Sequence, residues 1–135
     1  MAQVDDFLAE VLPRLRAAEI ALHDGDAEPR GELWSHRDPV TLFGAEANRT
    51  GWAEVAPTFD WIATRFSGCL SLEHEVVAAG ADGDLAYLVT IERITAVANG
   101  APVTYALRAT TIFRREDGVW RAVHRHGDPY REPTA

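Results

Sequence analysis

Hydrophobic residues recur at helical spacing near the start of the chain. Between Val4 and Leu22 they form one stripe with a period of about 3.6 residues, which predicts an amphipathic helix. The stripe consists of Val4, Phe7, Leu8, Val11, Leu12, Leu15, Ala18 and Leu22. Pro13 interrupts the backbone hydrogen bonds of this helix, so we expect a kink or a short leading turn there. Gly25 is the predicted stop signal.

A short strand and a second helix are predicted next. Residues 39–43 have the composition of a strand, which ends at Gly44. Segment 51–66 returns to the helical period and ends just before Gly68. Its apolar face carries Trp52, Val55, Phe59, Ile62 and Phe66. We expect Pro57 to bend this helix.

Turn sequences divide the second half of the chain into strands. Residues 81–84, 99–100 and 116–118 are rich in Asp, Asn and Gly and separate runs of Val, Ile, Thr and aromatic residues. The predicted strands cover about 70–79, 85–97, 103–115 and 119–127. Helices followed by an antiparallel sheet indicate an α+β fold, in which a strongly bent sheet and the helices across one face can enclose a conical cavity.

The composition limits the chemistry available to the protein. With 135 residues, the chain fits a single domain over 1–135. All 13 basic residues are arginine, which excludes a Schiff-base lysine, covalently held pyridoxal phosphate and a Walker-type phosphate lysine. The net charge of −8, with arginines scattered among acids, disfavours nucleic acid as a partner. Neither a Gly-x-Ser-x-Gly elbow nor a Gly-x-Gly-x-x-Gly fingerprint occurs, and we expect no cofactor.

Cysteine usage and hydropathy indicate the compartment. Cys69 is the only cysteine, so the chain has no intrachain disulfide or thiolate metal cage, and we interpret Cys69 as buried packing. The first residues are acidic, whereas a secretory signal is basic, and no apolar run approaches the ~18 residues of a membrane span. We therefore predict a cytoplasmic protein without a membrane partner.

The last predicted strand contains the strongest candidates for acid/base chemistry. Strict alternation places Trp120, Ala122, His124 and His126 on one face, and Asp128 continues the same parity. Imidazole titrates near neutral pH, so His124 or His126 could act as a general base. A structural role at the end of the sheet explains the same residues equally well. Metal ligation ranks third, because it needs further ligands and those available are His36 and Asp38.

A neighbouring strand places Arg108 on one face with Thr110 and Ile112. If this face looks into the cavity, Arg108 could bind an anionic or enolate-like oxygen. The alternative is a structural ion pair with a carboxylate such as Glu92, which we favour slightly.

The segment 34–39 is a candidate rim for the pocket. Trp34, His36 and Asp38 bring together an indole, an imidazole and a carboxylate just before the first strand. A tight turn stabilised by Asp38 explains them as well. Tyr87 is a further, weaker candidate for the pocket.

Trp61 lies opposite the apolar stripe of the second helix. An exposed indole there would meet a second subunit, which we prefer, or cover a pocket.

These segments together resemble a known family. Residues 34–51, the helix that begins at Trp52, and residues 108–126 are similar to the SnoaL-like domains of the nuclear-transport-factor-two-like superfamily, over nearly the whole chain. The Arg-x-Thr strand, the Asp-Gly turn, the Trp and the His-x-His also resemble the association domain of calcium/calmodulin-dependent kinases, which shares that fold.

The resemblance implies a cone of helices against a curved sheet, the cystatin-like roll, with a pocket between them and usually a homodimer or larger assembly. Relatives include polyketide cyclases, ketosteroid isomerases, dehydratases, epoxide hydrolases and non-catalytic binding or assembly domains. Asp38-Pro39-Val40 looks like the catalytic Asp-Pro-Val of ketosteroid isomerases. However, alignment of Arg49-Thr50-Gly51 places that family's aspartate near Leu42, and no tyrosine precedes Tyr87. We therefore do not predict steroid isomerisation.

The leading hypothesis is a cofactor-independent acid/base enzyme of isomerase, cyclase or dehydratase type, acting on a small, mostly apolar carbonyl compound. His126 or His124 would be the base, and Arg108 with Trp120 would bind and orient the substrate. Trp34, His36, Asp38 and Tyr87 are weaker site candidates. The alternative is a non-catalytic ligand-binding or homo-oligomeric assembly domain, and a metal-dependent hydrolase ranks third.

Overall fold

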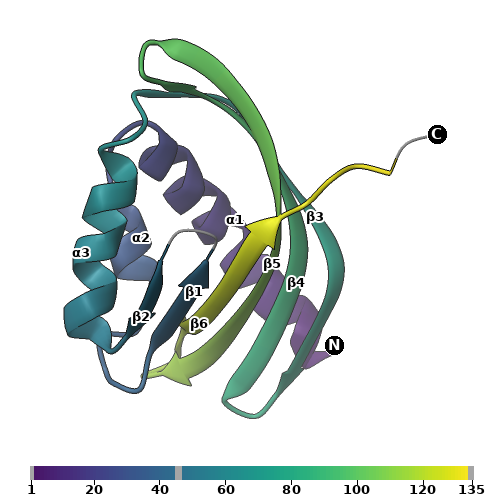
Figure 1. Cartoon of the computed structure of the whole chain (residues 1–135). Helices are drawn as coiled ribbons and strands as arrows, with labels where there is room; N and C mark the ends of the chain where they lie inside the picture. The colour runs from purple at the N-terminus through teal and green to yellow at the C-terminus, as the bar shows by residue number, and fades with distance from the viewer. Residues whose placement is uncertain (1, 45–46, 134–135) are drawn as a thin grey trace.

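The computed structural model describes residues 2–44 and 47–133. The helices are α1 (Gln3–His23), α2 (Glu28–Leu33) and α3 (Trp52–Ala63). The strands are β1 (Thr41–Gly44), β2 (Asn48–Thr50), β3 (Gly68–Asp82), β4 (Leu85–Ala98), β5 (Ala101–Glu116) and β6 (Val119–Pro129). The helices precede the long strands along the chain, as the sequence predicted (Figure 1).

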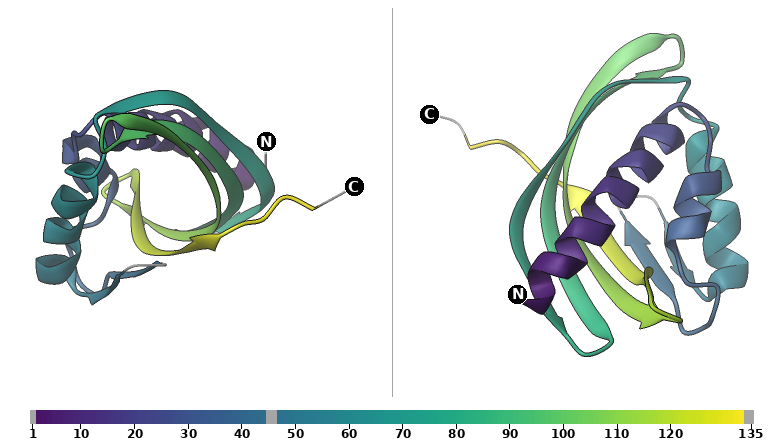
Figure 2. Two further views of the ribbon diagram at one scale, coloured as in Figure 1. Left: turned by 45° about the horizontal axis from the view of Figure 1, so that its top comes forward. Right: turned by 180° about the vertical axis from the view of Figure 1, so that it is seen from behind.

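The strands form one mixed sheet in the order β2-β1-β6-β5-β4-β3. Neighbouring strands are antiparallel except β1 and β6, which are parallel. The sheet is strongly curved, α1 lies across its concave face, and α2 and α3 stand at one side (Figure 2). Irregular register within β3 accompanies this curvature, since a β-bulge bends the strand that contains it. The expected α+β roll is confirmed.

The sequence pattern located the long elements and the short strand β1, and it missed α2 and β2. Predicted strand ends agree with β3 to β6 within a few residues. The elements α2 and β2, with 6 and 3 residues, are too short to show a period. The helix α1 continues through Pro13 and α3 through Pro57. Within the described residues, no helix is both long and apolar enough to cross a membrane.

The apolar stripe of α1 packs against the sheet. Phe7, Val11 and Leu15 are buried, and the Phe7 ring meets the Phe113 and Trp120 rings edge-on, each at a centroid distance of 5.2 Å. Aromatic pairs favour this edge-to-face geometry. These contacts fix the first half of α1 on β5 and β6, so the cavity lies toward the other end of the helix.

A β-bulge in β6 decides which side chains face the helices. Phe113 pairs with Ala122 and Ile112 pairs with His124, which leaves Val123 as an extra residue. One extra residue reverses the alternation of the strand. Trp120 and Ala122 are buried before the bulge, and the buried position after it belongs to Arg125.

Candidate functional site

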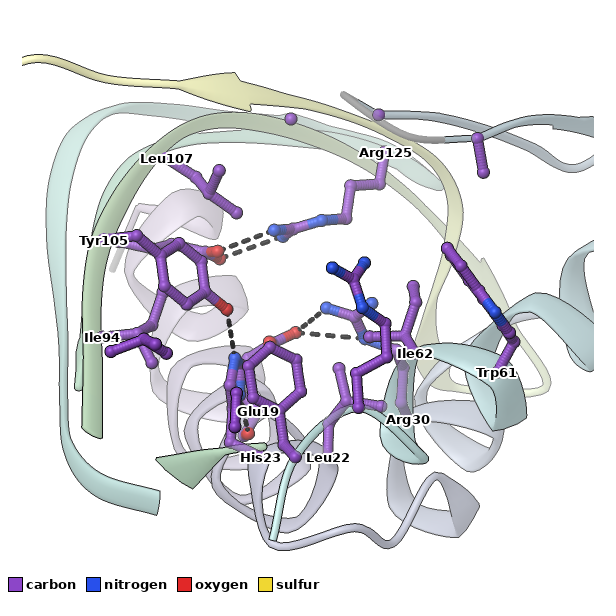
Figure 3. Close-up of a pocket in the computed structure, with 18 of the residues that line it drawn as sticks. Glu19, Leu22, His23, Arg30, Trp61, Ile62, Ile94, Tyr105, Leu107 and Arg125 are labelled. Carbon is purple, nitrogen blue, oxygen red and sulfur yellow. Dashed lines mark hydrogen bonds and ion pairs between the residues drawn. The ribbon is translucent and has the colours of Figure 1, made fainter. Parts of the chain in front are cut away.

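A cavity of about 640 Å³ lies between the concave face of the sheet and the helices. Its size suits a small organic molecule. Its apolar lining includes Leu22, Ile62, Phe66, Ile94, Val103 and Leu107. Trp61, which is 47% exposed, also lines it from α3, and the Arg65 guanidinium lies 5.2 Å from the centre of its ring (Figure 3). The position of Trp61 therefore supports the less favoured of its two predicted roles, which is to cover the pocket.

A buried ion pair crosses the concave face of the sheet beneath this cavity. Arg125 of β6 donates from Nη1 to Glu92 Oε2 at 2.9 Å and from Nη2 to Glu92 Oε1 at 2.6 Å. His74 Nε2 lies 3.3 Å from the same carboxylate. Burial alone would raise the pKa of Glu92, but Arg125 and His74 hold it well below its ordinary value. Glu92 therefore remains a carboxylate and is a poor general base at neutral pH.

Another buried ion pair joins the helices. Glu19 of α1 accepts hydrogen bonds from Nε and Nη2 of Arg30 in α2, and both side chains are almost fully buried. The Arg30 guanidinium also lies 5.1 Å from the centre of the Phe59 ring. Arg30 is thus held by a carboxylate on one side and by an aromatic ring on the other.

A histidine and a tyrosine meet in the cavity wall. His23 Nε2 is hydrogen-bonded to the Tyr105 hydroxyl, which joins the end of α1 to β5 (Figure 3). His23 Nδ1 lies 2.7 Å from the Glu19 carbonyl oxygen, one helical turn earlier. Phe66 lies against His23 at a centroid distance of 4.6 Å. Burial raises the pKa of Tyr105, and the carboxylates of Glu19 and Glu92 raise it further, so the phenol stays protonated. We call this pair the His23–Tyr105 dyad.

The candidate bases His124 and His126 do not line this cavity. The bulge at Val123 places them on the convex face, because it reverses the alternation on which the prediction relied. There His124 Nδ1 lies 2.7 Å from Thr41 Oγ1, and both imidazoles lie edge-on to Phe43. Burial, and then the charge of His126, lowers the pKa of His124. The expectation that these rings project into the cavity is wrong.

Arg108 is on the convex face as well. It donates to Asp128 from Nε at 3.0 Å and from Nη2 at 2.8 Å, and 62% of its side chain is exposed. A structural pair was the favoured interpretation, but the partner is Asp128, since Glu92 lies on the opposite face with Arg125. Tyr87 also faces outward and is 47% exposed. Neither residue lines the cavity.

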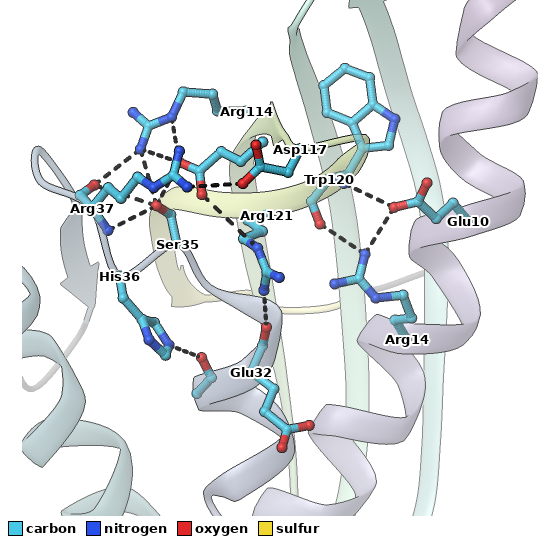
Figure 4. Close-up of polar contacts among 12 residues, drawn as sticks. Glu10, Arg14, Glu32, Ser35, His36, Arg37, Arg114, Asp117, Trp120 and Arg121 are labelled. Atoms are coloured by element: carbon cyan, nitrogen blue, oxygen red, sulfur yellow. Dashed lines mark hydrogen bonds and ion pairs between the residues drawn. The ribbon is translucent and has the colours of Figure 1, made fainter.

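The predicted rim residues serve the fold instead. Trp34 and Trp120 are buried in the core, with Trp34 edge-on to Phe59. His36 stacks on Trp52 at 4.1 Å and bonds to the Gly31 carbonyl from Nε2. Figure 4 labels His36 and Trp120 among a set of polar contacts, and neither residue lines the cavity.

A buried polar contact anchors the predicted rim segment to the sheet. Ser35 donates to Glu116 Oε2 at 2.8 Å, and Arg114 Nε donates to the same oxygen at 2.8 Å (Figure 4). Burial would raise the pKa of Glu116, but these hydrogen bonds keep it below its ordinary value. Segment 34–39 is therefore a structural connection to the end of β5.

Asp38 caps α3 and does not reach the cavity. Its Oδ1 accepts the Trp52 backbone N–H at 2.8 Å. We expect Asp38→Ala to lower the free energy of unfolding by about 0.5–2 kcal/mol, because this N–H loses its acceptor. Asp38→Asn, which keeps an oxygen at that place, should lose much less. Urea unfolding measures both variants, and equal losses would contradict a capping role.

Two features of the sequence point to residues that line the cavity. Glu19 and His23 are one turn apart and border the apolar stripe of α1. Glu92 occupies an inward position in β4 between Leu88 and Ala96, where alternation predicts an apolar residue. A charged side chain at a core position needs a partner, and this requirement points to a polar site.

In segments 2–44 and 47–133, no cluster of three or more His, Cys, Asp or Glu side chains is placed to hold a metal ion. Described polar groups of the cavity form ion pairs and hydrogen bonds with one another. The arrangement offers a hydroxyl, an imidazole and an apolar wall to a small organic ligand.

Several solved structures share this fold. An NTF2-like family protein from Streptomyces avermitilis with a provisional dehydratase assignment is 21% identical, covers 95% of this chain and 99% of its own, and has a TM-score of 0.74. A ketosteroid isomerase-like protein from Erwinia carotovora atroseptica is 14% identical over 93% of this chain and 97% of its own, with a TM-score of 0.73. At these identities the likeness concerns the fold.

The fold is also shared by an association domain. A calcium/calmodulin-dependent protein kinase type II association domain, provisionally assigned, from Thiobacillus denitrificans is 24% identical over 87% of this chain and 93% of its own, with a TM-score of 0.73. No curated protein matches the chain. The family model of the SnoaL-like domain matches residues 14–129. The chain therefore belongs to the SnoaL-like domain family.

Proposed function

We propose that the protein binds a small, mostly apolar carbonyl compound in this cavity and moves a proton on it without a cofactor. The observation that supports the proposal is the His23–Tyr105 dyad in the wall of an otherwise largely apolar cavity. An imidazole can take up a proton from a bound compound, either directly or through a phenol that is hydrogen-bonded to it. The base is thus His23, in place of His124 or His126.

The surroundings of the dyad favour this chemistry. Glu92 and Glu19 are each held in an ion pair by an arginine, so neither carboxylate is free to act as the base, and this leaves the imidazole of His23 for that role. The walls of Ile94, Phe66 and Leu107 exclude water from an apolar substrate.

Deuterium exchange tests the proposed proton transfer. We expect small cyclic ketones screened in deuterium oxide to exchange their α-hydrogens in the presence of the protein, as followed by proton NMR. His23→Gln should lower the exchange rate constant about 100-fold, because the amide cannot take up the proton.

Matched variants identify the base. His124→Ala and His126→Ala should exchange at the parental rate. A loss in these variants with no loss in His23→Gln would return the assignment to the convex face. Saturable binding of the ketones without any exchange by the parent protein would instead identify a non-catalytic binding domain.

We further propose that the protein is a homodimer, as the family resemblance implies, with the convex face of the sheet as the interface. Tyr87, Ile112 and His124 are successive partners across β4, β5 and β6, and Phe43 adjoins His124. Phe43, Tyr87 and Ile112 are exposed and His124 is half-buried, and such a row of apolar and imidazole groups can cover itself around a two-fold axis. Ile112→Arg should then shift the mass measured by light scattering from dimer to monomer. A monomeric parent protein would contradict the proposal.

A further inference from the structure

The hydrogen bonds of His23 fix the position of its proton. Nδ1 lies 2.7 Å from the Glu19 carbonyl oxygen, and a carbonyl oxygen only accepts, so Nδ1 carries the hydrogen. In the neutral imidazole Nε2 is then a bare acceptor, and the Tyr105 hydroxyl must donate to it. The neutral dyad therefore points the phenolic proton away from a ligand.

This direction limits what Tyr105 can offer to the cavity. With its proton committed to His23, the phenolic oxygen presents only lone pairs. It can accept a hydrogen bond from a ligand but cannot donate one. A ligand with an O–H group fits this state, whereas an oxyanion does not.

We propose that the site takes compounds with an ionisable O–H group, such as enols, phenols or carboxylic acids, and binds them as anions through a proton relay. The ligand O–H bond breaks and its proton passes to the Tyr105 oxygen, while the phenolic O–H bond breaks and that proton forms an N–H bond at His23 Nε2. The ligand becomes an anion, the imidazole becomes a cation and Tyr105 stays neutral. The new phenolic O–H then donates to the ligand oxyanion.

This inference rests on the proposed function, and it adds the chemical class of the ligand and the direction of the relay. Phe66 holds the rings of His23 and Tyr105 in place for the proton relay, since its ring centre lies 4.6 Å from that of His23 and 6.3 Å from that of Tyr105. Burial and the neighbouring carboxylates raise the pKa of Tyr105, which favours a tyrosine that passes on a proton over one that stays ionised.

The other charged groups around the dyad suit a transfer that separates charge. Glu19 with Arg30 and Glu92 with Arg125 are closed pairs and add no net charge. The imidazolium and the ligand anion formed by the relay are themselves a pair, joined through Tyr105. The other charged side chains that line the cavity are Glu19 from α1, Arg30 from α2, Arg65 after α3, Glu92 from β4 and Arg125 from β6, and His74 from β3 is hydrogen-bonded to Glu92.

The spectrum of bound 4-nitrophenol tests the relay, because its phenolate absorbs visible light and its neutral form does not. We expect bound probe to show the phenolate band at a pH where free probe is neutral, with its ionisation midpoint lowered by at least about one pH unit, or tenfold in the ionisation constant. His23→Gln should abolish the shift, because the amide cannot accept the proton. Tyr105→Phe should abolish it because the relay is broken.

Control variants separate the relay from general damage to the cavity. Tyr87→Phe and His126→Gln should keep the band, since neither residue lines the cavity and neither change touches the dyad. Circular dichroism checks that each variant is folded, and His23→Gln alone decides the test if Tyr105→Phe does not fold. Probe that binds the parent protein but stays neutral, or a band retained in His23→Gln, would overturn the relay. So would a cavity that binds cyclic ketones but not the probe, whereas binding of neither would overturn the proposed function as well.

Discussion

Replacing Arg125 by methionine is expected to lower the free energy of unfolding by about 3–5 kcal/mol, because it leaves the Glu92 carboxylate buried without its guanidinium partner. Glu92 is 1% exposed, so water cannot replace the lost hydrogen bonds. The measurement is urea-induced unfolding at neutral pH. The loss should greatly exceed that of Arg108→Met, whose ion pair with Asp128 lies on the surface.

A second substitution separates the cost of the unpaired charge from the contribution of the pair. Glu92→Gln/Arg125→Met removes both charges and leaves an amide oxygen for His74. We expect this double variant to be more stable than Arg125→Met, since no buried carboxylate remains uncompensated. A double variant as unstable as the single one would show that Arg125 stabilises through its packing alone.

The Glu92–Arg125 ion pair also predicts that the free energy of unfolding falls at acid pH. Folding lowers the pKa of Glu92, so its contribution to stability is complete above the pKa of the unfolded chain, about 4.3, and is lost as the pH falls toward the folded value. Below about pH 4.3 the parent protein should therefore lose stability more steeply than the double variant. Unfolding measured at several pH values checks this, and parallel curves would contradict it.

Deleting Val123 should cost much less than Arg125→Met. Without this extra residue Trp120 and Arg125 are four positions apart, so regular alternation still points both toward the helices. The indole stays in the core and the Glu92 carboxylate keeps its partner, so the variant loses only the local bend of β6. We expect the deletion variant to fold and to lose less than about 2 kcal/mol in urea unfolding, and accumulation as insoluble protein would contradict this.

A substitution at the same position is the matched control. Val123→Ala keeps the residue count of β6, and with it the bulge, so it should cost only about 1 kcal/mol. Equal destabilisation by the deletion and the substitution would show that the side chain of Val123 matters and the bulge does not.

This bulge also explains how far the sequence could predict the site. Apolar periodicity located α1, α3 and the long strands, because burial of one face requires it. The same alternation predicted that His124 and Trp120 share a face, which is wrong. A bulge depends on the pairing between β5 and β6, and nothing in the local pattern around Val123 marks it.

The pocket itself depends on contacts between residues distant in the sequence. Glu92 and Arg125 are 33 positions apart, and His23 and Tyr105 are 82 apart. A single sequence marks Glu92 as a charged residue at a core position, but it does not say which arginine reaches it. The family resemblance predicted a pocket between sheet and helices, and the residues that line it followed only from the three-dimensional arrangement.

The extra residue in β6 also separates two parts of the strand that have different roles. The part before it, with Trp120, contacts the first half of α1 and holds the aromatic core, whereas the part after it, with Arg125, shapes the ligand chamber. Each part can therefore change with little effect on the other. Redesign of ligand preference should begin at Gly127, where a new side chain would alter the chamber while the Arg125–Glu92 pair and the aromatic anchor of the fold are left intact.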